Sequence, residues 1–337
     1  MFGLQLGGRS ISAGESTAPA ILRGNHLKLA TARGALKVLA ERLCPKQVWL
    51  PSYLCPVMLD CFGKRVRFYA VGADFRVSDH MWLENVGAGD LVVFIDYFGF
   101  RFWDQCGHKA KARGAWVVED ASQALLNEKF SESADYVVSS PRKFVGVPDG
   151  GILLARGNQK LTDIKLRQPS SSWRHSAFTA CVRRAEFDLN DAGQDRSWYQ
   201  LYQESEAAAP VQPCVMSEVS QLILRCAIDW QQVAHLRRKN YRYLATALSR
   251  FALFPKLQPG MTPLGFPAFF KNRDAVRTAL FARNIFPPIH WALKGFVPPD
   301  FVDSHDLSAR ILTLPCDQRY DRVDLKRIVD VIQEVGQ

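Results

Sequence analysis

The feature that most constrains the fold is a series of short apolar segments between Val117 and Ala155. Two of them, VVED and ADYVVS, end in polar residues, and a third follows a Gly-Gly turn. Short apolar runs of this kind are typical of parallel strands that are buried on both faces. The carboxyl ends of such strands meet at one edge of the sheet, where open α/β sheets bind ligands. We therefore expect Asp120 and Lys143, which follow two of these segments, to share one pocket.

A carboxylate at one strand end and a lysine at the next suit one cofactor in particular. Pyridoxal phosphate needs a lysine amine for its Schiff base and an Asp that keeps the pyridine nitrogen protonated. Taken singly, Asp120 is more typical of a turn cap, and Lys143 of a solvated surface charge, than of a catalytic residue. The order Asp-x-x-Gln, strand, Ser-x-x-Lys, Asp-Gly-Gly, strand is much harder to produce by chance, and it favours the cofactor hypothesis.

This stretch resembles the core of the DegT/DnrJ/EryC1/StrS aminotransferases, which are fold-type-I pyridoxal phosphate enzymes acting largely on nucleotide-linked keto-sugars. The similarity runs from about Leu29 to the C-terminus. It implies an α/β fold of the aspartate aminotransferase type, with a mainly parallel central sheet and a smaller C-terminal α+β domain. It also implies an N-terminal arm and large cofactor-binding domain over residues 1–235, and a small domain over residues 236–337.

The resemblance assigns roles to the residues of the site. It implies that Lys143 is the Schiff-base lysine and that Asp120 is the partner of the pyridine nitrogen. The other cofactor-binding residues that it implies are Ala32, Arg33, Cys55, Gln123 and Ser140. Ala32 and Arg33 open a predicted helix, and the free N–H groups of a helix N-terminus are a natural phosphate site.

Three positions depart from the family pattern. Thr31-Ala32-Arg33 stands where relatives carry a turn such as Ser-Gly-Thr or Ser-Gly-Arg. Cys55 stands where relatives often place an aromatic ring that stacks on the cofactor, which leaves Tyr53 or Tyr97 as candidates for that cover. Relatives also carry an Asn that reaches the phosphate of the neighbouring subunit, but the corresponding segment here reads PCVMSE. The resemblance still implies a homodimer. Substrate contact is predicted for three residues: Tyr97, His290 and Arg319.

Apolar spacing predicts the remaining elements. A helix is expected over residues 29–43 with Thr31 as its N-cap, a strand over 90–100, and a nearly continuous helical region from Ser217 to Phe251. Residues 158–212 look irregular, as in a lid, a dimer contact or a mobile segment. The C-terminal part predicts a strand at PLGFPAFF, a helix at NRDAVRTALFARN, strands at PPIHWAL and ARILTLPC, and a final helix.

Composition narrows the class of protein. The 337 residues are 47% hydrophobic and 23% charged, which is typical of a soluble globular protein, and no apolar run reaches the roughly 18 residues that span a bilayer. With no signal sequence evident, we expect a cytoplasmic location. The eight cysteines lack paired spacing, so we expect neither a metal site nor a disulfide framework. The net charge of +10 is spread along the chain, which argues against nucleic acid as a partner and suits an anionic cofactor or substrate.

The function that the resemblance implies is transfer of an amino group from glutamate or glutamine to a keto-sugar, nucleotide-linked, in sugar, polysaccharide or secondary-metabolite biosynthesis. Two alternatives stay open. A dehydratase-like enzyme of the same fold is one, although such relatives replace the lysine by His and Lys143 is present. A catalytically silent scaffold or regulatory protein is the other. The departures at Cys55, at the missing Asn and at Ala32-Arg33 favour it, whereas the presence of Lys143, Asp120 and Gln123 counts against it.

Overall fold

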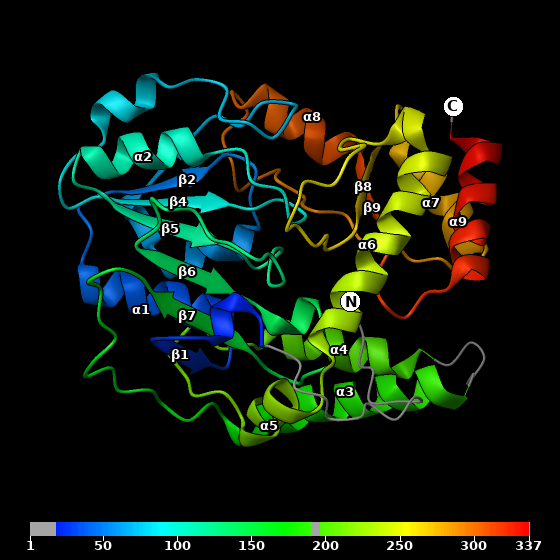
Figure 1. Ribbon diagram of the computed structural model, residues 1–337, viewed down its shortest axis with the longest axis horizontal. Helices are drawn as coiled ribbons and strands as arrows, with labels where there is room; N and C mark the ends of the chain where they lie inside the picture. The colour runs from blue at the N-terminus through cyan, green and yellow to red at the C-terminus, as the bar shows by residue number, and fades with distance from the viewer. Residues whose placement is uncertain (1–17, 191–195, 337) are drawn as a thin grey trace.

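The computed structural model describes residues 18–190 and 196–336. Most of the N-terminal arm predicted from the sequence, residues 1–17, lies outside these ranges. A seven-stranded sheet in the order β1-β7-β6-β5-β4-β2-β3 forms one half of the molecule, on the left in Figure 1. Its strands are β1 (His26–Leu29), β2 (Val48–Pro51), β3 (Val66–Tyr69), β4 (Leu91–Ile95), β5 (Trp116–Asp120), β6 (Tyr136–Ser139) and β7 (Gly151–Ala155).

The direction of the strands confirms a mainly parallel sheet. Strands β2 to β6 pair in parallel, and they are rich in Val, Ile and Leu because helices cover both faces. The expectation of parallel pairing is wrong for β7, which is antiparallel to both β1 and β6. Its first residue, Gly151, therefore lies at the edge where its neighbour β6 ends.

Helix α1 (Ala32–Leu43) packs against β6 and β7, and α2 (Asp104–Ala112) packs against β4 and β5. The predicted cap of α1 is confirmed, because the Thr31 hydroxyl accepts a hydrogen bond from the Gly34 N–H at 3.0 Å. The predicted start at Leu29 is wrong, since Leu29 is the last residue of β1. Short 3₁₀ helices connect the elements: η1 (Ala20–Leu22), η2 (Pro56–Cys61), η3 (Gly63–Arg65), η4 (Met81–Asn85), η5 (Pro141–Lys143) and η6 (Ser249–Phe251).

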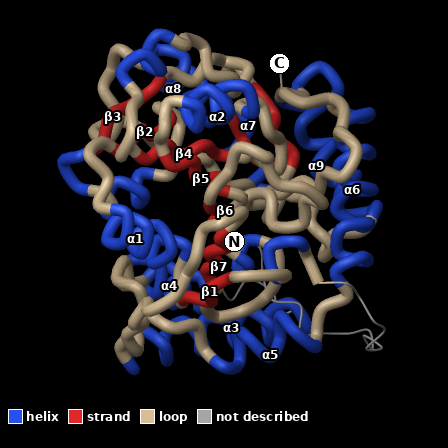
Figure 2. The backbone as a smooth tube through the Cα atoms, turned by 60° about the vertical axis from the view of Figure 1, so that its left-hand side comes forward, coloured by secondary structure: helices blue, strands red, loops and turns tan. Residues whose placement is uncertain are grey.

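The prediction that residues 158–212 are irregular is wrong. Helices α3 (Ser171–Asn190) and α4 (Ser197–Ala207) pack against each other, and both lie with α5 (Glu218–Cys226) on the side of β1 (Figure 2). The Trp173 indole joins the two by donating to the Ser205 carbonyl at 3.0 Å. Polar side chains cover most of α3, and pairs such as Arg184 with Asp188 stabilise it, so the sequence lacks a clear apolar period there.

The C-terminal part is built on α6 (Trp230–Ala247), which packs against β8 and α9. The other elements are β8 (Phe266–Phe269), α7 (Arg273–Ala282), α8 (Val302–Arg310), β9 (Ile311–Leu314) and α9 (Arg322–Val335), with β8 and β9 antiparallel. The predicted strand at PPIHWAL is wrong: the segment is a loop whose two prolines cannot donate ladder hydrogen bonds. The predicted helical region from Ser217 breaks between α5 and α6, where Asp229 caps the new helix.

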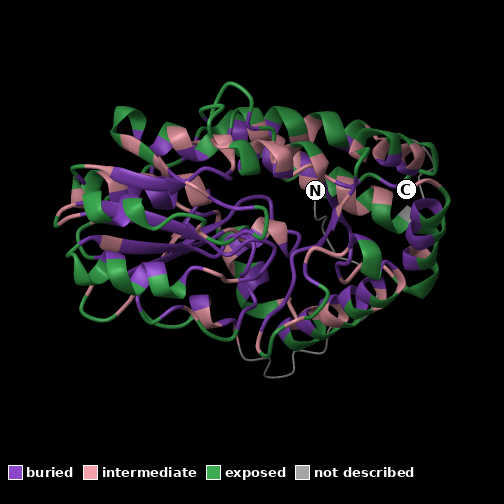
Figure 3. Ribbon diagram, turned by 90° about the horizontal axis from the view of Figure 1, so that it is seen from above, coloured by how far each residue is buried: buried purple, intermediate pink, exposed green. Residues whose placement is uncertain are grey.

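The boundary proposed at residue 235 falls inside α6, a continuous helix, and division into two domains stays a prediction. Figure 3 shows the buried strands of the sheet in the left half of the view, between helices whose outer faces are exposed. One large apolar cluster extends from the sheet to β8, β9 and α9. This continuous core fixes the strand ends relative to the C-terminal part.

Candidate active site

The ends of β5 and β6 bring two predicted site residues to the same edge of the sheet. Asp120 is the last residue of β5, and the next N–H along the chain, that of Ala121, donates to the Val138 carbonyl of β6 at 2.8 Å. Ser140 follows β6, and Lys143 ends the 3₁₀ turn after it. Asp120 is 7% exposed, and its Oδ1 accepts a hydrogen bond from the Ser122 N–H at 2.9 Å.

The N-terminus of α1 lies against the same edge. The Gly150 N–H donates to the Ala30 carbonyl at 2.8 Å, and a Cβ at Gly151 would overlap the Thr31 carbonyl and the Ala32 nitrogen. Only glycine allows this approach of β7 to the helix. The first N–H groups of α1, those of Ala32 and Arg33, have no partner within the helix. Together with Ser140 they form what we call the helix-end site, which suits an anion.

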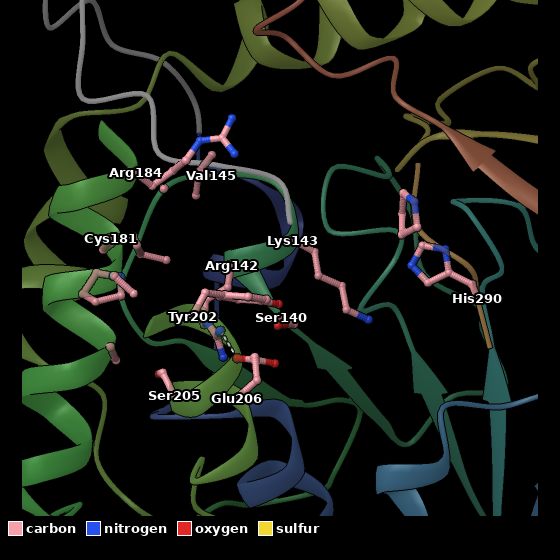
Figure 4. A pocket seen from close by; sticks show the side chains of 16 residues that line it. Ser140, Arg142, Lys143, Val145, Cys181, Arg184, Tyr202, Ser205, Glu206 and His290 are labelled. Carbon is pink, nitrogen blue, oxygen red and sulfur yellow. Dashed lines mark hydrogen bonds and ion pairs between the residues drawn. The ribbon is translucent and has the colours of Figure 1, made fainter. Parts of the chain in front are cut away.

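A cavity of about 220 Å³ lies beside Lys143. Ser140, Arg142, Lys143 and His290 line one side of it, and residues of α3 and α4 line the other: Ala177, Ala180, Cys181, Arg184, Tyr202, Ser205 and Glu206. Figure 4 shows the Lys143 side chain extending toward His290 and away from Arg142. Within the described residues, the Lys143 amine makes no ion pair and no side-chain hydrogen bond. The amine is therefore available to a ligand.

Arg142 and Glu206 form an ion pair at the wall of the cavity. Burial opposes ionisation of both side chains, yet each stabilises the charge of the other. The pKa of Glu206 is lowered, first by Arg142 and then by Arg33 and Lys143, which overcome the effect of burial. The pKa of Arg142 is raised, because Glu206 outweighs the desolvation that acts against its charge. Glu206 is thus a carboxylate among three cations.

His290 contacts the end of the small sheet: its Nδ1 lies 2.8 Å from the Thr313 hydroxyl of β9. Burial, and after it the positive charge of Lys143, lowers the pKa of His290 to about 3. The ring is therefore neutral at physiological pH and can act through hydrogen bonds.

Three further predicted residues lie close to the strand ends. The Gln123 Oε1 accepts a hydrogen bond from the Phe98 N–H at 2.6 Å, while its buried Nε2 has no partner among the described residues. Cys55 is partly buried, and burial raises the pKa of its thiol, with smaller effects from Lys143 and Asp120 that place it near both. The Tyr97 hydroxyl donates to the Tyr53 carbonyl, and Tyr97 is buried in the core.

Both candidates for an aromatic cover are packed against other rings. The Tyr53 ring lies 5.7 Å from that of Tyr97 and 5.5 Å from that of Trp291, between centroids, and Tyr53 is fully buried. Neither tyrosine lines the cavity beside Lys143. Neither Tyr53 nor Tyr97 is therefore free to stack on the cofactor ring in place of the aromatic residue that Cys55 replaces.

Arg319 does not line the cavity beside Lys143, but the hollow that it lines shares Val145 and Gly146 with that cavity. Arg319 lines this second hollow, of about 670 Å³, between α6 and the start of α9. Its guanidinium makes a two-pronged ion pair with the buried carboxylate of Asp317, through Nε at 2.8 Å and Nη2 at 2.9 Å. The structure thus places His290 on the wall of the cavity beside Lys143, and Arg319 on the wall of the adjoining hollow.

Sequence reasoning missed the residues that fix the turn carrying Lys143. The fully buried Arg237 donates from Nη2 to the Phe144 carbonyl at 3.2 Å, and the Gln318 amide donates to the same oxygen at 2.8 Å. A signal was present: Arg237 lies between Ala234 and Tyr241 on the apolar face of α6. Glu206 left no comparable signal, because its partner lies 64 positions away in the chain.

The described residues offer neither a metal-binding cluster nor a membrane-spanning helix. Residues 18–190 and 196–336 hold no group of three or more His, Cys, Asp or Glu side chains that could bind a metal ion. No helix in those ranges is both long and apolar enough to cross a membrane.

Comparison with known proteins places the fold. No protein-family model and no curated protein match the chain. Among solved structures, a DegT/DnrJ/EryC1/StrS aminotransferase from Brucella abortus is 15% identical, with a TM-score of 0.65 over 94% of this chain and 87% of its own. The chain has the fold of these aminotransferases. The predicted fold-type-I class, with its mainly parallel sheet, is confirmed.

Two further solved structures share this fold. The sugar aminotransferase CalS13 from Micromonospora echinospora is 13% identical, with a TM-score of 0.62 over 92% of this chain and 87% of its own. NtdA from Bacillus subtilis, with bound cofactor PMP, is 12% identical, with a TM-score of 0.67 over 94% of this chain and 74% of its own.

Proposed function

We propose that the protein is a pyridoxal phosphate-dependent aminotransferase that aminates a keto-sugar. One observation carries this proposal: the Lys143 amine, free of protein partners in the described residues, lines a cavity, and Asp120 ends the strand that pairs with the one before Ser140 and Lys143. The shared fold supports it, since one structural neighbour is a sugar aminotransferase and another has bound cofactor PMP.

The residues present fit the cofactor. The close contact of Gly151 with the start of α1 builds an anion site for the phosphate end of the cofactor. The unpaired Gln123 amide offers a hydrogen-bond donor for its ring end. Ala32, Arg33 and Ser140 would bind the phosphate, Asp120 would accept a hydrogen bond from the protonated ring nitrogen, and Cys55 would lie beside the ring. When bound, pyridoxal phosphate supplies an aldehyde carbon that an amine can attack and a ring that accepts electron density.

The chain's own residues would then handle protons and orientation. Lys143 would hold the cofactor and, once released from it, take the proton from the α-carbon of the amino donor as a general base. The turn that carries Lys143 is fixed by Arg237 and Gln318, which hold the next carbonyl in the chain. The Lys143 side chain extends toward His290, whose neutral ring would orient the substrate by hydrogen bonds. Substrate roles for Tyr97 and Arg319 stay predictions.

Several finer points belong to the same proposal and rest on the family resemblance. They are a glutamate or glutamine donor, a nucleotide-linked sugar, a homodimer and a cytoplasmic location. Of the two rival functions, the dehydratase-like one is disfavoured because it would replace Lys143. The silent scaffold is favoured by Cys55, which stands where relatives often carry an aromatic ring, and it predicts no cofactor binding.

The proposal is tested by the absorbance spectrum of the purified protein with added pyridoxal phosphate. The wild type should develop the visible band of a lysine-bound cofactor, and glutamate or glutamine should bleach it. Lys143→Ala should lose the band, whereas Lys160→Ala, a change at an exposed lysine, should keep it. A wild type without a band at saturating cofactor would refute the proposal and favour the scaffold.

A further inference from the structure

The carboxylate of Glu206 lies where a bound anion would be expected. It pairs with Arg142, and it lines the same cavity as Ser140 and Lys143 (Figure 4). After Arg142, the charges of Arg33 and Lys143 contribute to its lowered pKa. Arg33 and Ser140 belong to the helix-end site, and Arg142 and Lys143 line the same cavity as Ser140, so a carboxylate of the protein already compensates the charge of these cations.

The backbone holds Glu206 in this position. The Glu206 carbonyl accepts a hydrogen bond from the Arg33 guanidinium at 3.3 Å. Shortly after it in the chain, the Pro210 carbonyl accepts a hydrogen bond from the Thr31 hydroxyl at 2.8 Å. The end of α4 is thereby tied to the start of α1. Glu206 therefore reaches the helix-end site from a fixed backbone, and only its side chain has to turn to release Arg142.

We propose that Arg142 is a phosphate-binding residue and that Glu206 is its built-in competitor, so a phosphate group binds the helix-end site only when the Glu206 side chain leaves Arg142. The identity of the natural ligand, pyridoxal phosphate, rests on the proposed function. The competition between Glu206 and an anion for Arg142 does not. A phosphate dianion and a carboxylate within reach of one guanidinium repel each other. Glu206 thus weakens the binding of any phosphate without touching the rest of the cofactor.

The consequence is a selective effect on phosphorylated ligands. Glu206→Gln keeps the size of the side chain and removes its charge, so pyridoxal phosphate should bind at least about tenfold more tightly, the ratio that corresponds to ~1.4 kcal/mol. Pyridoxal, which lacks the phosphate, should bind the variant and the wild type alike. Glu204→Gln, an exposed neighbour on α4, is the matched control and should change neither affinity.

The experiment has two arms. Fluorescence titration gives the affinities for pyridoxal phosphate and for pyridoxal, and thermal unfolding with inorganic phosphate, against chloride of equal ionic strength, tests the anion site alone. The tighter binding should disappear in Arg142→Met/Glu206→Gln. Equal affinity of wild type and Glu206→Gln for pyridoxal phosphate, with equal stabilisation by phosphate, would overturn the inference. If neither protein binds pyridoxal phosphate but phosphate stabilises Glu206→Gln selectively, the inference stands and the proposed function fails.

Discussion

Arg101 joins two carboxylates that are fully buried at the ends of neighbouring strands. Its Nη2 lies 3.3 Å from Asp96, after β4, and 2.6 Å from Glu119, in β5, while both carboxylates are 0% exposed. Glu119 directly precedes Asp120 in β5, and side chains that follow one another in a strand point to opposite faces. This charged triad therefore anchors, from the other face, the strand end on which the cofactor site depends.

The change Arg101→Met should destabilise the fold by about 3 kcal/mol at about pH 8, the lower end of the cost of breaking a buried ion pair. The lower end applies because each carboxylate keeps another donor. The Trp103 indole lies 2.9 Å from Asp96, and the Ser131 N–H lies 2.8 Å from Glu119.

The loss should depend on pH in a defined direction. Burial raises the pKa of Asp96 above 3.8 and that of Glu119 well above 4.5, although Arg101 opposes both shifts. A carboxyl group whose pKa is raised in the folded state stabilises the fold fully below its ordinary pKa, and this contribution is lost as the pH rises through the raised value. Without Arg101 both values rise further, so the loss extends to higher pH. The destabilisation should therefore be smaller at about pH 5 than at about pH 8, by about 1.4 kcal/mol for each pKa unit.

Urea unfolding of wild type and variant at the two pH values measures these free energies directly. Arg283→Met, which breaks an exposed pair with Glu334, is the control and should cost less than about 1 kcal/mol at either pH. A loss below about 1 kcal/mol in Arg101→Met, or a loss that does not change with pH, would refute the electrostatic reasoning.

Three further changes test the scaffold of the site. Gly151→Ala should cost about 1–3 kcal/mol of unfolding free energy and weaken cofactor binding, because the new Cβ overlaps Thr31; Gly87→Ala, with open space around it, should do neither. Arg237→Met should cost more than about 2 kcal/mol in urea unfolding, since it strips donors from the buried carbonyls of Phe144 and Leu264, and a smaller loss would contradict the role given to this side chain. Asp321→Ala removes the capping box of α9 and should lower the unfolding free energy by about 1 kcal/mol; an unchanged midpoint would show that the cap is dispensable.

Local signals in the sequence were enough to predict the elements that carry the central site residues. The strands before Asp120 and Ser140 are short, apolar and bounded by polar residues, and Thr31 is a good cap, so each was recognisable from its neighbours in the chain. The antiparallel direction of β7 could not be predicted, because the sequence of an apolar strand does not specify which strand lies beside it. Its pairing depends on contact with β1, over a hundred residues earlier in the chain.

The errors in the second half of the chain have the same origin. Helices α3 and α4 bury few residues and rely on each other, so their apolar period is weak, and the wall of the cavity that they form was not foreseen. The ion pair of Arg142 with Glu206 and the contact of Arg237 with Phe144 join distant segments. Such pairs follow from the fold and cannot be read from local spacing.

The most direct test of the proposed cofactor site is to reduce the protein with borohydride in the presence of pyridoxal phosphate and to map the labelled peptide by mass spectrometry. The proposed function predicts one pyridoxyl group per chain, on Lys143, and a much smaller yield in Asp120→Asn. Label spread over exposed lysines such as Lys160, with none on Lys143, would contradict it.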